Sequence, residues 1–172
     1  MAADTRDSYS STIMRVLKKV GLTSFTLDSV TPGDGACFMT ATLQQIRRNK
    51  ETYPNQIQTM AENLDQFTLR KAVKSFVNSS IHPIILNLKS MFSDATGMTW
   101  NFYWSNKYML KNVLGSEEQW TWADHHFIQF TAWFIARDIM IVSDTSTQQD
   151  LWRTISGNIE DASTLCEDPP IY

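Results

Sequence analysis

The chain has few cysteines, and that shortage excludes two classes of small protein. Its two cysteines, Cys37 and Cys166, are too few for a disulfide framework, and their spacing is not that of a metal site. We therefore expect neither a disulfide-rich secreted domain nor a zinc module. A cytoplasmic or other reducing compartment fits this cysteine usage.

Clustered positive charge is also scarce. The formal net charge is -3, and no basic run exceeds a pair, as in Lys18-Lys19 and Arg47-Arg48. Binding to nucleic acid depends on several closely placed lysines and arginines that neutralise phosphates. We therefore expect no nucleic-acid partner.

Long apolar runs are missing as well. The longest apolar stretch, residues 127–142, is interrupted by Gln129, Arg137 and Asp138, so it does not predict a membrane span. Residues 1–11 are polar and lack the apolar centre of a signal peptide. No membrane association is expected.

What remains is the composition of a globular protein of 172 residues, 42% of them hydrophobic. This length predicts one domain, residues 1–172, with residues 1–10 flexible. Helical spacing and strand-like alternation occur in the same chain, which predicts a mixed α/β or α+β fold. We expect helices near residues 10–20, 38–48, 66–77, 100–113 and 125–136, a further apolar segment at 84–91, a loop at 92–98, and strands at 25–30, 139–142 and 152–156.

Two expectations concern how these elements pack. The run 139–142 is apolar at every position, which predicts a central strand buried on both faces, with the helix after Cys37 packed against it. The six tryptophans could line a sugar-binding groove. Their placement among Leu, Ile and Phe on predicted helices favours packing in the core instead.

The segment around Cys37 is the strongest functional signal. A Pro32-Gly33 break is followed by Asp34-Gly35-Ala36-Cys37 and then by the predicted helix. A helix N-terminus favours a thiolate, and its free N–H groups can stabilise an oxyanion on an attacked carbonyl. The alternative is that Cys37 is a small core residue with no chemical role.

Four stretches, taken in order, resemble the ovarian tumour (OTU) family of cysteine proteases, which are deubiquitinases. Residues 33–38 are similar to the family's Asp-Gly-x-Cys-(Leu/Phe) nucleophile turn. The other matches are Leu69-Arg70-Lys71-Ala72-Val73, similar to its Leu-Arg-x-x-Val helix; Tyr108-Met109-Leu110 followed by Trp120 or Trp122; and 128–132 followed by the strand 137–142. The resemblance covers about residues 25 to 172.

The resemblance implies a papain-like fold with a small central β-sheet packed between helices. It makes Cys37 the nucleophile, lets Asp34 shape the turn, and forms the oxyanion hole from the backbone of Asp34, Gly35, Ala36 and Cys37. The substrate would be ubiquitin or a ubiquitin-like protein, joined through its C-terminal glycine to a lysine. Hydrolysis would pass through a Cys37 thioester, in a monomer with no metal or organic cofactor.

The family's catalytic histidine lies on a strand near the end of its domain, and this chain ends at Tyr172, where that strand is expected to begin. We therefore expect the histidine beyond Tyr172. His125 and His126 follow Asp124 at a predicted helix start, where capping or packing is the expected role, and His82 is expected in a loop. Cys166 stands among acidic residues that would raise its pKa, so it is expected to be unreactive.

Two functions remain open from the sequence. One is an OTU-type thiol isopeptidase that uses Cys37. The other is an OTU-like module that binds ubiquitin or another partner without cutting it, because its general base is missing. The sequence indicates neither a linkage preference nor a choice between ubiquitin and its relatives.

Overall fold

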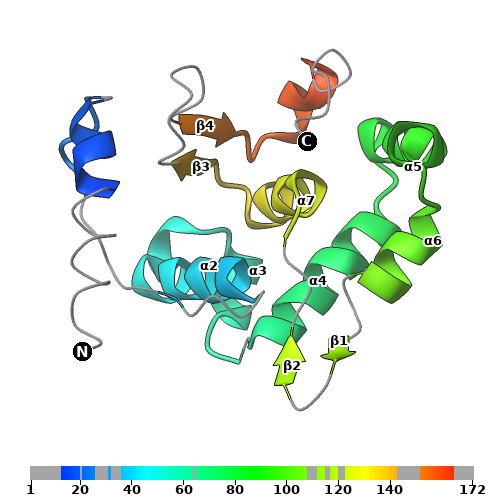
Figure 1. The fold of residues 1–172 in the computed structure, drawn as a ribbon, viewed down its shortest axis with the longest axis horizontal. Coiled ribbons are helices and arrows are strands. Elements are labelled where there is room, and N and C mark those ends of the chain that lie inside the picture. Colours follow the sequence, from blue (N-terminus) through cyan, green and yellow to red (C-terminus); the bar gives the residue numbers. More distant parts are fainter. Residues whose placement is uncertain are drawn as a thin grey trace.

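The computed structural model describes residues 13–19, 21–25, 31, 36–63, 65–107, 112–114, 117–119, 123–142 and 152–164. Within these residues the chain is mostly helical and carries two antiparallel two-stranded sheets (Figure 1). The fold is thus of the mixed α+β class that the sequence predicts. The predicted strand at 25–30, the turn residues 32–35 and the segment after Thr164 fall outside the described residues, except for Phe25.

The elements follow one another with short connections. A helix covers residues 13–19, and Gly21 after it has a φ of 78°. The later elements are α2 (Cys37–Arg48), η1 (Lys50–Thr52), α3 (Asn55–Met60), α4 (Gln66–Ser79), α5 (Pro83–Thr96), α6 (Trp100–Phe102), the π-helical turn η2 (Tyr103–Lys107), β1 (Asn112–Leu114), β2 (Glu117–Gln119), α7 (His125–Ile135), β3 (Ile139–Val142), β4 (Trp152–Ile155) and η3 (Ile159–Thr164).

Helix α7 lies in the middle of the molecule, between α4 and the β3–β4 hairpin (Figure 1). It starts where the sequence predicts, because the Asp124 carboxylate accepts a hydrogen bond from the Phe127 backbone N–H at 2.9 Å. The same Oδ1 atom accepts a bond from the Tyr103 hydroxyl at 2.8 Å. The helix ends one residue early, because Ala136 takes the left-handed conformation with φ 51°.

The core is strongly aromatic. Phe92 meets Tyr103 and Trp100 edge-on, with ring centroids 5.0 and 5.1 Å apart. Trp104 and Trp133 are buried in the same cluster, which confirms the packing role predicted for them. The buried members of the cluster come from α2, α4, α5, η2 and α7: Met39, Leu43, Leu69, Val73, Val77, Ile85, Phe92, Tyr103, Trp104, Phe127, Phe130 and Trp133.

Helices α2 and α4 occur where the sequence predicts helices, and each also buries a polar or charged residue. On α2 the buried positions include Met39 and Thr42, whereas Phe38 and Ala41 are only half-buried. The Thr42 hydroxyl can be buried because it donates to the Phe38 carbonyl at 2.8 Å.

On α4, the apolar Phe67 is 37% exposed, while the charged Arg70 is 1% exposed. The Arg70 guanidinium carbon lies 5.5 Å from the centre of the Phe127 ring, in cation–π geometry. A charged residue is thus buried on α4, where the apolar pattern of the sequence predicts only hydrophobic residues inside.

The predicted loop at 92–98 is wrong over most of its length. Helix α5 continues to Thr96, and Gly97 ends it in the left-handed conformation with φ 68°. Phe92 is completely buried on this helix. The glycine marks a helix end here, and not the middle of a loop.

The predicted helix at 100–113 is only partly confirmed, and residues 108–111 lie outside the described residues. It consists of α6 and the π-helical turn η2, and Asn112–Leu114 forms strand β1, paired with β2.

The strand at 139–142 exists, but it is not a central strand buried on both faces. Within the described residues β3 pairs only with β4, from Ile139 opposite Ile155 to Val142 opposite Trp152, and Ile141 is 37% exposed. Helix α2 packs mainly on α4, as the hydrogen bond from Gln66 to the Thr40 hydroxyl at 2.7 Å illustrates. Ile139 reaches only a small second cluster that includes Ile46 of α2.

Candidate functional site

Cys37 is the first residue of α2, and its side chain is partly exposed. Ala36 before it is completely buried, and its carbonyl accepts the first helical hydrogen bond, from Thr40 N–H at 2.9 Å. The thiol therefore lies at the positive end of a twelve-residue helix and is accessible to solvent. This location suits a nucleophile better than a core residue.

The first turns of α2 and α7 are in contact. The ring of Phe38 meets the ring of Phe127 edge-on, with centroids 6.3 Å apart. Because Phe127 is held by the Asp124 cap, this contact fixes the start of α2 against a rigid element. The backbone beside Cys37 is therefore well supported.

Only half of the predicted catalytic turn can be located. Ala36 and Cys37 are described, whereas Asp34 and Gly35 lie outside the described residues. The shape of the predicted oxyanion hole, and the role of Asp34 in it, therefore stay predictions.

The three histidines make contacts of a structural kind. His82 is the N-cap of α5, where its Nδ1 accepts the Ile84 N–H at 3.3 Å and its Nε2 lies 2.9 Å from a carboxylate oxygen of Glu160. Because Nδ1 acts as an acceptor, the ring proton is on Nε2 and points to Glu160. His82 thus lies in the connection between α4 and α5, as expected of a loop residue, and it also caps α5.

His125 and His126 stand at the start of α7, and their ring centroids are 3.8 Å apart. The ring of His126 packs against Phe92 at 5.3 Å. Among the described residues, Cys37 makes no hydrogen bond to a histidine, so the general base is not assigned by geometry. The contact with Phe92 matches the packing role expected of His126, whereas His125 is exposed.

No family model, characterised protein or solved structure matches the chain. Its function must therefore be inferred from its own residues and geometry. Within the described residues, no three His, Cys, Asp or Glu side chains gather as a metal site would require, and none of the helices has the apolar length needed to cross a bilayer.

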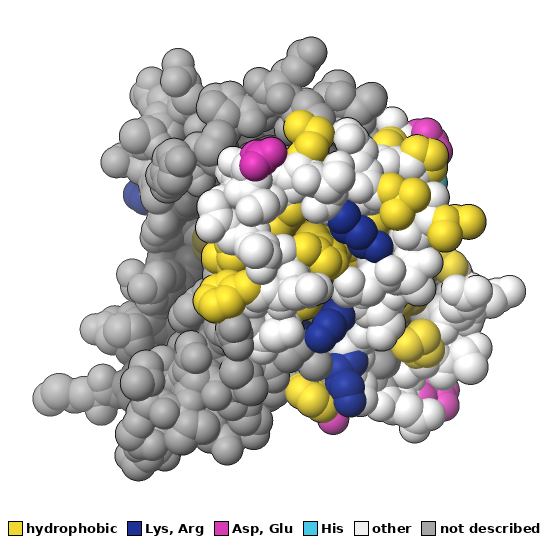
Figure 2. Space-filling model, turned by 90° about the vertical axis from the view of Figure 1, so that its right-hand side faces the viewer, with side chains coloured by type: hydrophobic (Ala, Val, Ile, Leu, Met, Phe, Trp, Pro, Cys, Tyr) yellow, Lys and Arg dark blue, Asp and Glu magenta, His cyan; other side chains and the backbone are white. Residues whose placement is uncertain are grey.

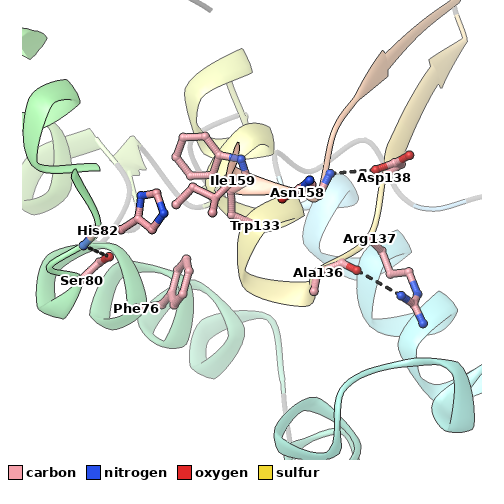
Figure 3. A pocket seen from close by; sticks show the side chains of 10 residues that line it. Phe76, Ser80, His82, Trp133, Ala136, Arg137, Asp138, Asn158 and Ile159 are labelled. Carbon is pink, nitrogen blue, oxygen red and sulfur yellow. Dashed lines mark hydrogen bonds between the residues drawn. The ribbon is translucent and has the colours of Figure 1, made fainter. Parts of the chain in front are cut away.

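A pocket lies on another part of the molecule (Figure 3). It has a volume of about 780 Å³ and forms where the ends of α4 and α7 meet the connection between β4 and η3. Its lining residues are Phe76, Ser80, His82, Trp133, Ala136, Arg137, Asp138, Gly157, Asn158 and Ile159. Cys37 is not among them, so the predicted nucleophile and this pocket are separate features.

One wall of the pocket depends on a glycine. A Cβ atom on Gly157 would lie 2.3 Å from the backbone nitrogen of Arg137, so that only glycine fits. The Gly157 N–H donates to the Asp138 carboxylate at 2.8 Å, which ties the strand end to the segment after α7. The sequence showed this position as a turn, but no local pattern indicated the close backbone approach.

Proposed function

We propose that the chain is an OTU-type thiol isopeptidase that hydrolyses the bond between a ubiquitin or ubiquitin-like C-terminal glycine and a lysine. The observation that carries the proposal is the partly exposed Cys37 thiol at the N-terminus of α2, in the sequence context of an Asp-Gly-Ala-Cys turn. The small β3–β4 sheet beside helices is compatible with a mixed α+β class. A reducing compartment would keep the thiol free.

The proposed reaction has two steps. The Cys37 thiolate attacks the glycine carbonyl, the C–N bond breaks, and the lysine amine leaves after it takes up a proton. Water then hydrolyses the thioester and restores the thiol. The helix dipole and the N–H groups at residues 36 and 37 would favour the thiolate and the oxyanion.

Cleavage of a di-ubiquitin substrate tests the role of the thiol. Cys37→Ala is expected to abolish turnover with an unchanged far-UV spectrum, since the proposed nucleophile is removed. Cys166→Ala is the matched control, and it should retain full activity. Equal turnover by wild type and Cys37→Ala would refute the proposal.

The general base needs a separate test. We expect no general base at His125, which is exposed, or at His126, whose ring packs against Phe92. Each alanine variant should therefore keep the acid limb of the pH–rate profile. Loss of that limb in either variant would identify the altered histidine as the base.

A second candidate, a binding module without turnover, is favoured by a different observation. On the side of the molecule formed by α4, α5 and α6, apolar side chains are interspersed with lysines and arginines (Figure 2). Large apolar residues exposed on these helices and on the residue before His82 are Phe67, Ile81, Leu86, Met91 and Phe102. Exposed apolar groups gathered on one face mark many protein-binding surfaces.

The two candidates give opposite results with monomeric ubiquitin. A binding module would bind it without cleaving chains, and Phe102→Asp on this face would weaken the complex by about tenfold. The isopeptidase would turn over chains, with Cys37 required.

A further inference from the structure

The pocket between α4, α7 and the β4–η3 connection combines an apolar interior with polar groups at its edge. Phe76, Trp133, Ala136 and Ile159 supply the apolar part. In Figure 3, Phe76, Ser80 and His82 lie on one side of it, and Ala136, Arg137 and Asp138 lie on the other. Pockets of this volume and mixed lining commonly hold small organic ligands.

Most acceptors of the pocket are already used. His82 Nδ1 accepts from Ile84, and the Asn158 side-chain oxygen accepts from the Glu160 N–H at 3.2 Å. One carboxylate oxygen of Asp138 accepts from Gly157. Few acceptor positions therefore remain for a ligand.

The hydrogen-bond donors of the pocket, in contrast, are not all used. The Ser80 hydroxyl accepts a bond from His82 N–H at 3.2 Å, and within the described residues its own proton has no acceptor. The Arg137 guanidinium donates from Nη1 to the Ala136 carbonyl at 3.2 Å and lies over the Tyr53 ring, 5.7 Å from its centre, so that it points away from the pocket interior (Figure 3). The free hydrogen-bonding capacity of the pocket is thus mainly that of donors.

Trp133 gives the strongest indication. It is 5% exposed, and its indole nitrogen is buried and has no hydrogen-bond partner among the described residues. A buried N–H without an acceptor costs roughly as much as a lost hydrogen bond, so nearly all such groups in proteins are paired. An oxygen atom of a ligand would supply the missing partner.

We propose that this pocket binds a small organic molecule with an apolar, ring-sized body and an oxygen acceptor, either a carboxylate or a carbonyl. The body packs on Phe76 and Trp133, and the oxygen accepts from the Trp133 indole N–H. The Trp133 indole nitrogen is covered in the empty pocket. Ile159 packs against the core cluster that contains Trp133, and it shifts to admit the ligand. The site lies apart from Cys37 and does not depend on the isopeptidase proposal.

Three probes with the same body and different head groups test the proposal on the full chain. They are 3-phenylpropionate, 3-phenylpropionamide and 3-phenylpropylamine, read by the chemical shift of the Trp133 indole N–H. That signal is assigned as the one missing from the spectrum of Trp133→Phe. The acid and the amide should shift it to saturation, with dissociation constants of roughly millimolar size for such small ligands, and the amine should not.

Substitutions in and outside the pocket measure how much each contact contributes to ligand binding. Trp133→Phe keeps a ring but removes the N–H, and it should raise the dissociation constant of the acid by about fivefold to tenfold, as the shifts of other pocket signals report. Trp100→Phe removes an indole N–H that donates to Asn78 outside the pocket, at 2.8 Å, and should change binding less than about twofold. Ser80→Ala changes a partly exposed position that tolerates substitution. It should raise the dissociation constant of the acid by about threefold.

The head groups then identify the acceptor. Tighter binding of the acid than of the amide would show that a carboxylate is preferred, and equal binding of the two would favour a carbonyl. Equal binding of the amine, or shifts that rise linearly without saturation for all three probes, would overturn the proposal. The pocket would then be a water-filled hollow.

Discussion

Asp124→Ala should destabilise the protein by about 2 kcal/mol, because this carboxylate serves two elements at once. It caps α7 through the Phe127 N–H and accepts the hydroxyl of Tyr103, a residue 1% exposed on η2. Loss of an N-cap costs about 1 kcal/mol, and loss of a hydrogen bond to a buried hydroxyl costs about as much again. For a protein of this size the melting temperature should fall by roughly 4–8 °C.

Urea unfolding of Asp124→Ala, Tyr103→Phe and the double variant measures the two parts. Tyr103→Phe alone should cost about 1 kcal/mol, and the double variant should show a coupling of about the same size. Asp124→Asn retains an acceptor oxygen and should lose less than about 1 kcal/mol. A loss below about 0.5 kcal/mol in Asp124→Ala would refute the two-element role of this carboxylate.

Three further substitutions test other parts of the fold. Gly157→Ala forces a Cβ against the Arg137 backbone and should cost about 2–3 kcal/mol in urea unfolding, while an unchanged midpoint would contradict the close approach. Phe92→Ala removes a fully buried ring and should cost about 3–5 kcal/mol by the same measurement, whereas a loss under about 1 kcal/mol would fit the loop that the sequence predicted. The backbone N–H and the hydroxyl of Thr68 hold the pKa of Asp65 below its ordinary value of 3.8, so the stability that this carboxylate gives is present above about pH 4 and is lost as the pH falls through the lowered pKa. Unfolding followed from pH 5 to pH 2 should therefore be less acid-sensitive in Asp65→Asn, and identical acid profiles would contradict this assignment.

Helices with local start and stop signals could be predicted from the sequence. The Asp124 cap predicted the start of α7, and α2 begins at Cys37, next to its predicted start. These signals act over a few residues, so tertiary packing did not alter them.

The wrong predictions concern features of the fold that depend on tertiary contacts. An apolar run such as 139–142 looks the same whether its strand is central or belongs to a half-exposed hairpin, because only the neighbouring layers distinguish the two. The buried Arg70 lies against the ring of Phe127, a residue 57 positions further along the chain. The pocket lined by Trp133 is formed by three segments that are remote in the sequence, and no local sequence pattern predicts it.

The central claim is that Cys37 is a nucleophile directed at ubiquitin. The most direct test is reaction with a ubiquitin that carries a thiol-reactive group at its C-terminus, read by intact mass on wild type, Cys37→Ala and Cys166→Ala. We expect a single adduct on wild type and on Cys166→Ala and none on Cys37→Ala. An adduct that persists in Cys37→Ala, or no adduct on any of the three proteins, would contradict the claim.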